Sequence, residues 1–391
     1  MVMIWGYLFF NQGPVYYHLM VCVIIVAAGF SNQKPLRSLV FVILASIWAG
    51  ISRINWFPVP GLLAAMFYLL EVPRLGRSFW QYWRWPAIWA ISGVGVAFVA
   101  QTVYIAISGN PVANFGTSFT SSLLWYRLFP NTTYPDGVLN SIVLAILPIL
   151  LLLILKYGRT RGKIHYERGL MLLALLIVFF VGGIIVSVKI GGGSNLHNMD
   201  AFLVFLFIAA VYFYYDRVSQ DTTAVKSLRP VHWVITFLLI LIPVISVIRV
   251  DGEISSYDNK PVIQDLGVLQ EIIDATPSES GQVLFISQRH FITFHYIQGV
   301  TLVPDYEKVF LMEMAMAGNQ AYFEQFEQDL KNHRFALIVS ESLSMTIQDE
   351  QYMFFEENNA WTTRVTALIR KYYHESAWLP NTGIVVSEPN P

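Results

Sequence analysis

The residue types best suited to chemistry lie in one polar stretch, residues 189–200, between two long apolar runs. Its sequence is KIGGGSNLHNMD. It combines an ammonium, two amides, an imidazole and a carboxylate with three consecutive glycines. An ammonium can neutralise a phosphate, and glycines let the backbone approach an anionic head group closely. The carboxylate can serve as a base or orient the imidazole. The candidate residues are Lys189, Gly191, Asn195, His197 and Asp200.

A flexible turn between two helices is the alternative interpretation of this stretch. One histidine and one carboxylate do not form a metal site without ligands from elsewhere, so no metal site is expected there.

Two other loops carry groups that can act with this one. The segment 52–60, SRINWFPVP, offers Arg53 and Asn55. Arg53 is the only cation of that segment, and a lipid phosphate is a natural partner for it; the alternative is an interfacial arginine that reaches head groups. The segment 108–137 has a single carboxylate, Asp136, in the sequence YPDG. A role in the turn is the stronger interpretation of Asp136.

The composition indicates an integral membrane protein with two parts. Hydrophobic residues make up 55% of the 391 residues and charged residues only 13%, and the mean hydropathy is +0.51. Residues 1–250 hold 17 Lys and Arg against 6 Asp and Glu, whereas residues 251–391 hold 8 against 20. We therefore expect a membrane module over 1–250 and a soluble domain over 251–391. No basic stripe in the soluble part suggests nucleic acid.

Apolar runs long enough, or nearly long enough, to cross a membrane predict about eight transmembrane helices. They lie at about 14–30, 38–51, 59–70, 86–107, 138–155, 170–188, 201–215 and 231–250. One set of alternate loops carries thirteen Lys and Arg and the other set carries three. Because basic loops stay in the cytoplasm, the three loops with candidate residues and the soluble domain are expected on the outer face of the cytoplasmic membrane.

The soluble domain is expected to be α/β. Short β-branched runs at 282–287, 336–340 and 383–387 predict buried strands, and helical spacing of apolar residues predicts helices over 262–275 and 317–333. Alternating helices and strands favour a small, largely parallel sheet. Ser287 to His290 follow the first strand, where an α/β site can lie, but nothing in their spacing supports chemistry typical of soluble enzymes.

Two stretches carry a resemblance to a known family. WAGISRINWFPVPGLLAAMFYLLEVP (48–73) and SVKIGGGSNLHNMDAFLVF (187–205), followed by an outer tail with VLFISQRHFITF, resemble bacterial GT-C superfamily glycosyltransferases, in particular those similar to protein mannosyltransferases. Lys189, Gly191 and Asn195 match the K-x-G-x-x-x-N pattern of an outer loop in that family. The resemblance implies transfer of a sugar from a polyprenyl-phosphate donor to an acceptor at the outer face. The residues indicate no cofactor, and they leave the need for a divalent cation open.

The chain departs from that family at its start. Members carry their key acidic residue in a large first outer loop, and this chain has no such loop. The resemblance thus implies a homologue that lacks the N-terminal part, with no assigned base; Asp136 and Asp200 are the candidates. The alternative function is a non-catalytic membrane subunit with protein partners, which the missing loop favours. A transporter is less supported, since paired charges within the membrane are lacking.

Overall fold

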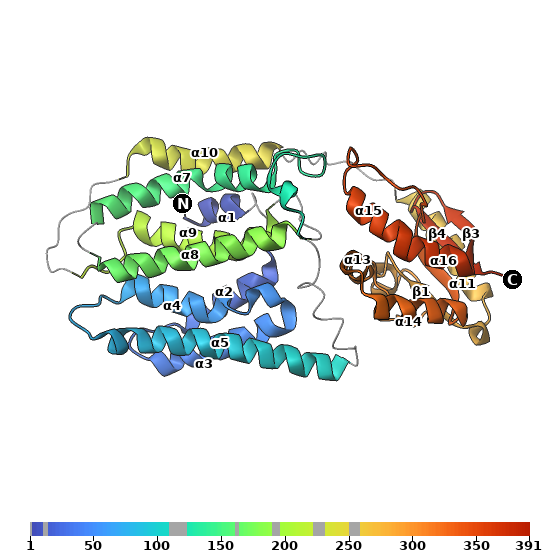
Figure 1. Ribbon diagram of the computed structural model, residues 1–391, viewed down its shortest axis with the longest axis horizontal. Coiled ribbons are helices and arrows are strands. Elements are labelled where there is room, and N and C mark those ends of the chain that lie inside the picture. Colours follow the sequence, from blue (N-terminus) through green and yellow to red (C-terminus); the bar gives the residue numbers. More distant parts are fainter. Residues whose placement is uncertain are drawn as a thin grey trace. The chain divides into compact units, whose positions relative to one another are not determined.

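The computed structural model describes residues 2–10, 15–108, 123–160, 164–189, 196–221, 231–249 and 259–391. They belong to two compact units. Unit 1, up to residue 249, is helical, and unit 2, residues 259–391, combines helices with a sheet (Figure 1).

Unit 1 consists of helices that lie side by side (Figure 1). They are α1 (Val2–Phe10), α2 (Tyr17–Gly29), α3 (Pro35–Ser52), α4 (Val59–Glu71), α5 (Phe79–Ser108), α7 (Val138–Thr160), α8 (Tyr166–Ser187), α9 (Asp200–Tyr214) and α10 (Trp233–Arg249). Short 3-10 turns precede or connect them at η1 (Ile54–Trp56), η3 (Trp125–Leu128) and η4 (His197–Met199).

Six helical segments in the described part of the chain are long and apolar enough to cross a membrane. They are Pro35–Ser52, Ile54–Glu71, Phe79–Ser108, Val138–Gly158, Tyr166–Ser187 and His197–Tyr214. The protein is therefore a membrane protein. The runs predicted at 14–30 and 231–250 are also helical, but α2 and the apolar part of α10 are shorter than a full crossing. The count of eight spans and the outward orientation remain predictions.

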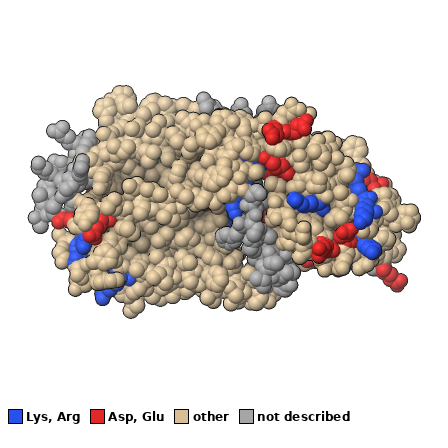
Figure 2. Space-filling view, viewed as in Figure 1, with Lys and Arg blue, Asp and Glu red and all other residues tan. Residues whose placement is uncertain are grey.

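The interior of unit 1 is organised around α4 and α9. Most of each of these segments is buried inside the protein, whereas little of α5 is. A helix that is apolar all round belongs in such an interior. Close approach depends on small residues: a Cβ at Gly61 of α4 would lie 2.3 Å from the carbonyl oxygen of Trp89 in α5. On the visible face of unit 1 the middle of the helices carries no Lys, Arg, Asp or Glu among the described residues (Figure 2).

Unit 2 contains a four-stranded sheet in the order β1-β2-β4-β3. The strands are β1 (Gln282–Phe285), β2 (Phe335–Glu341), β3 (Tyr373–Leu379) and β4 (Ile384–Pro389). The prediction of a largely parallel sheet is wrong: β1 pairs with β2 in parallel, but β4 is antiparallel to both β2 and β3. The missed strand is β3, an edge strand whose sequence YHESAWL is polar and mostly exposed, and an edge needs no apolar alternation.

Helices cover both faces of this sheet. They are α11 (Lys260–Ala275), α12 (His290–Thr293), α13 (Lys308–Ala317), α14 (Gln320–Lys331), α15 (Phe355–Trp361), the π-helix η6 (Thr362–Thr366) and α16 (Ala367–Tyr372), besides the turn η5 (Ser278–Ser280). Leu284 packs into one core with α13, α14 and α16, and its neighbour Phe285 packs into the other core with α11. The helices predicted over 262–275 and 317–333 are confirmed as α11 and α14.

Candidate functional site

Two loops that are distant in sequence meet at one end of unit 1. Arg53, between α3 and η1, donates a hydrogen bond from Nη2 to Oδ1 of Asn198 in η4, at 3.0 Å. Trp56 donates from Nε1 to Oδ2 of Asp200, also at 3.0 Å. These two bonds place the segment that follows α3 against the start of α9. The expected meeting of 52–60 with 189–200 is present in the described parts of both loops.

An aromatic cavity of about 560 Å³ opens beside this contact. The side chains that line it are Tyr16, His18, Trp48, Ile51, Ser52, Arg53 and Trp56. The guanidinium of Arg53 lies 4.8 Å from the ring centre of Tyr16 and 5.9 Å from that of Trp56. Aromatic faces attract and orient a cation, so these rings help to hold the guanidinium in place.

Arg53 makes no direct ion pair within the described residues, although the buried Asp200 lies close enough to interact with its charge. A guanidinium has five N–H donors. The hydrogen bond to the amide oxygen of Asn198 uses one of them. The nearby carboxylate of Asp200 is engaged elsewhere: it is buried and accepts hydrogen bonds from Trp56 and from the backbone N–H of Ala201 at 2.6 Å. A positioned, partly buried guanidinium with remaining donors is suited to an anionic oxygen ligand.

The other predicted site residues are distributed around this cavity. His197 in η4 packs its ring edge-on against Tyr16, with ring centres 5.8 Å apart. Asn55 lies within η1, outside the residues that line the cavity. Lys189 follows α8 and is partly buried, and this burial lowers the pKa of its ammonium. Gly191 and Asn195 lie outside the described residues.

Asp136 is not part of this cavity. It is exposed in the turn that precedes α7, next to Gly137, whose φ of +67° suits glycine. The neighbouring Asn131 stabilises that loop by accepting hydrogen bonds from the backbone N–H groups of Thr133 and Tyr134. This geometry agrees with the role in a turn that the sequence favoured.

Sequence reasoning missed three members of the site: Tyr16, Trp48 and Asn198. Asn198 lies in the polar stretch already selected, so its amide was a detectable signal. Tyr16 and Trp48 resemble ordinary aromatic residues at helix ends, and Trp48 uses its indole N–H on the carbonyl of His18, at 3.0 Å. Nothing in their spacing indicated that they would line a cavity together with Arg53.

Comparisons with models of protein families, with characterised proteins and with solved structures found no match to this chain. The resemblance to GT-C enzymes therefore remains a prediction, and the support for a site comes from its geometry.

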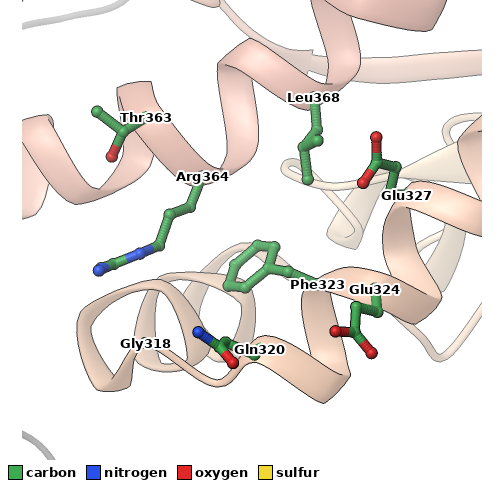
Figure 3. Close-up of a pocket in the computed structure, with 8 residues that line it drawn as sticks. All are labelled: Gly318, Gln320, Phe323, Glu324, Glu327, Thr363, Arg364 and Leu368. Atoms are coloured by element: carbon green, nitrogen blue, oxygen red, sulfur yellow. The ribbon is translucent and has the colours of Figure 1, made fainter.

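Unit 2 has a groove of about 310 Å³ between α14 and the π-helix η6 (Figure 3). Two of its charged side chains bond to other neighbouring helices, α16 and α13. Glu327 accepts hydrogen bonds from Lys371 and Tyr372, and Arg364 donates to the carbonyl of Ala315 at the end of α13. Thr363 bonds to backbone within its own helix. We interpret this groove as a seam between helices, not as the main site.

The residues after β1 are also structural. Arg289 donates from Nε to the carbonyl of Phe285 at 2.8 Å and from Nη1 to that of Pro304 at 3.1 Å, so it ties two loops together. His290 and His295 are exposed. In the described part of the chain no group of three or more His, Cys, Asp or Glu is placed to hold a metal ion.

Proposed function

We propose that the Arg53 cavity binds the phosphate of a polyprenyl-phosphate sugar and that the protein is a GT-C-like glycosyltransferase acting at the outer face of the bacterial cytoplasmic membrane. The observation that carries the proposal is the guanidinium of Arg53, which lies against two aromatic rings beside a cavity and makes no direct ion pair with a carboxylate in the described residues. A phosphate supplies the charge and the hydrogen-bond acceptors that this group lacks.

The aromatic lining supports an amphipathic ligand. Tyr16, Trp48 and Trp56 offer apolar faces with polar edges, which suit the boundary between a lipid chain and its head group. Lys189 and His197 belong to the loop that reaches the same end of unit 1, where they would contact the sugar or the phosphate. Gly191 and Asn195 complete the loop that the family pattern assigns to the donor.

The second candidate function is a non-catalytic membrane subunit that binds the lipid. The residues that line the cavity favour it. None of the described residues that line the cavity is a carboxylate, and acid–base chemistry on an acceptor hydroxyl needs a base within hydrogen-bond reach. Asp200 is buried and satisfied by Trp56, and Asp136 is exposed in a turn. The base of the proposed reaction is therefore unassigned.

Binding of a radiolabelled polyprenyl-phosphate sugar to the purified protein tests the proposal. Replacing Arg53 by Ala removes a charge-assisted contact worth about 1.5–3 kcal/mol, so we expect affinity to fall roughly ten- to a hundredfold. Lys189→Ala is expected to weaken binding by a similar or smaller factor. Arg53→Lys keeps the charge but not the planar fork and should lie between Arg53→Ala and the wild type.

Arg84→Ala is the matched control, because Arg84 is an exposed arginine on α5 whose guanidinium lies 5.8 Å from the ring centre of Trp85. It should bind like the wild type. Equal binding by Arg53→Ala and wild type would refute the site. If the protein binds the labelled donor but transfers no sugar to membranes that contain acceptor, the result favours the non-catalytic subunit over the enzyme.

A further inference from the structure

A second surface of interest lies on unit 2, in the loop between β2 and α15. Residues 344–354, which we call the apolar loop, expose five large apolar side chains within ten positions. They are Met345, Ile347, Tyr352, Met353 and Phe354, each between 38% and 57% exposed. Scattered apolar residues are ordinary on a protein surface, but a dense group of them marks a contact with another apolar surface.

The backbone of the apolar loop is fixed by side chains of α15. Asn359 accepts a hydrogen bond from the N–H of Gln348 at 2.8 Å and donates to its carbonyl at 2.9 Å, as a neighbouring strand would. Asn358 donates to the carbonyl of Thr346 at 2.8 Å. Thr346 and Gln348 are therefore held against the helix, and the side chains between and beside them, Met345 and Ile347, extend outward.

Both ends of the loop are also anchored. Leu343, directly before it, is buried in the core of unit 2, and Arg370 donates to its carbonyl at 2.9 Å. At the other end Phe354 adopts a left-handed backbone with φ of +55°, which is unusual for a residue with a side chain. Strain of this kind persists where the surrounding structure enforces it, often at binding sites. The apolar groups are thus presented in a fixed arrangement, which reduces the entropy lost on binding.

We infer that the apolar loop inserts into the head-group region of the membrane that unit 1 spans. The chain between Arg249 and Asn259 has nine residues and spans at most ~36 Å. Unit 2 is thereby held at a high effective concentration near the bilayer, so even a weak affinity for lipid is sufficient. Tyr and Phe among the exposed groups suit the interface between water and lipid tails.

Charge favours a lipid surface of low charge over an anionic one. The apolar loop contains Asp349 and Glu350 and no Lys or Arg, so insertion depends on the apolar side chains and not on attraction to acidic lipids. The occupants to be distinguished from lipid are water, a protein partner and another part of this chain.

A fluorophore on a single cysteine tests the inference in the full-length protein. Cys22, the only native cysteine, is replaced by Ala; Ile347→Cys carries the label, and Gln328→Cys, an exposed polar position on α14, is the matched control. The protein is reconstituted in phosphatidylcholine with brominated acyl chains. We expect lipid quenching at position 347 to exceed that at 328 severalfold, and to fall when phosphatidylglycerol is added.

Two results would overturn the inference. Strong quenching of position 347 by aqueous iodide, with lipid quenching equal to that of the control, would place the loop in water. Weak quenching by both agents would show that protein covers it. A label on Tyr352→Cys repeats the test at the other end of the loop. Because Ile347 is intact in this variant, the result does not depend on that substitution.

Discussion

Two arginines of unit 1, Arg53 and Arg168, show how the same side chain is used in different ways at the two ends of one helix bundle. Arg168, in α8, is fully buried and satisfies all its donors: it bonds to the carbonyl of Leu69 through Nε and Nη2, to the carbonyl and hydroxyl of Ser219, and to Asp221 at 2.7 Å. Arg53 bonds to one neutral amide and faces a cavity.

The two sites lie at opposite ends of the same helices, because α4 and α9 begin near Arg53 and end near Arg168. Around Arg168 the charges are paired. Asp221 also accepts from the backbone N–H of Arg74 at 2.5 Å and of His165 at 2.6 Å, and Lys156 pairs with Asp216 at 2.8 Å. A saturated arginine stabilises the loops that it joins; an arginine with donors remaining is available to a ligand. This difference is the physical basis for assigning structure to one end and binding to the other.

The largest expected effect comes from Arg168→Ala compared with Arg53→Ala in stability. Removing Arg168 takes the charged partner from Asp221, which keeps its two backbone donors, and leaves the carbonyls of Leu69 and Ser219 without the N–H groups that they accept from. The loss of these five hydrogen bonds, one of them charged on both sides, should cost about 3–5 kcal/mol in the free energy of unfolding. Arg53→Ala should cost only about 1–2 kcal/mol, because one hydrogen bond to a neutral group and two contacts with aromatic rings are lost. Denaturant unfolding in detergent measures both. Equal losses would show that Arg53 is structural too, and would remove the contrast between the two ends.

The pH dependence of stability should follow Asp221. Burial alone would raise the pKa of this carboxyl, but the hydrogen bonds from the His165 backbone and from Arg168 outweigh burial and hold the pKa below its ordinary value. A depressed pKa in the folded state adds stability that is present above the unfolded value, about 3.9, and is lost as pH falls through the folded value. The melting temperature should thus be steady from about pH 5 to 8 and fall in more acidic buffer.

Asp221→Asn sharpens this test, because it removes the titrating group. The variant should melt lower than wild type at pH 7 and should lose less on acidification. If the melting temperatures of the wild type and of Asp221→Asn fall in parallel as the pH is lowered, other carboxylates cause the loss of stability in acid. Binding of ligand at the cavity should be unaffected at pH 7, since Asp221 is at the other end of the helices.

The smallest effect is expected at Asn198. Its amide oxygen accepts a hydrogen bond from Arg53 and so orients the guanidinium. Asn198→Ala should therefore weaken ligand binding by roughly two- to tenfold, which corresponds to the loss of one hydrogen bond. Combining it with Arg53→Ala gives a double-mutant cycle. If Asn198 acts through Arg53, the double variant binds no more weakly than Arg53→Ala alone. Additive losses would instead indicate that Asn198 contacts the ligand directly.

Part of the architecture was predictable because it depends on local patterns. Continuous apolar runs require burial in lipid or protein, and in the described residues each predicted run is mostly helical. β-branched runs predicted β1, β2 and β4, whose side chains are buried, whereas the exposed edge strand β3 carries no such pattern. The parallel sheet was wrong for the same reason: strand direction depends on β3 and β4 forming a hairpin, which the missing strand concealed.

The sequence by itself determined that the protein crosses a membrane, that a unit with strands follows the apolar part, and that Arg53 and the stretch 189–200 carry polar groups at helix ends. Only the tertiary structure decided which of these groups meet. It joined Arg53 to Asn198, turned Asp200 inward to Trp56, and placed the guanidinium against the rings of Tyr16 and Trp56. The reason is physical. Hydropathy indicates whether a segment is more stable in lipid or in water, but the contacts of a polar side chain depend on partners that are distant in sequence, as Asn198 is from Arg53.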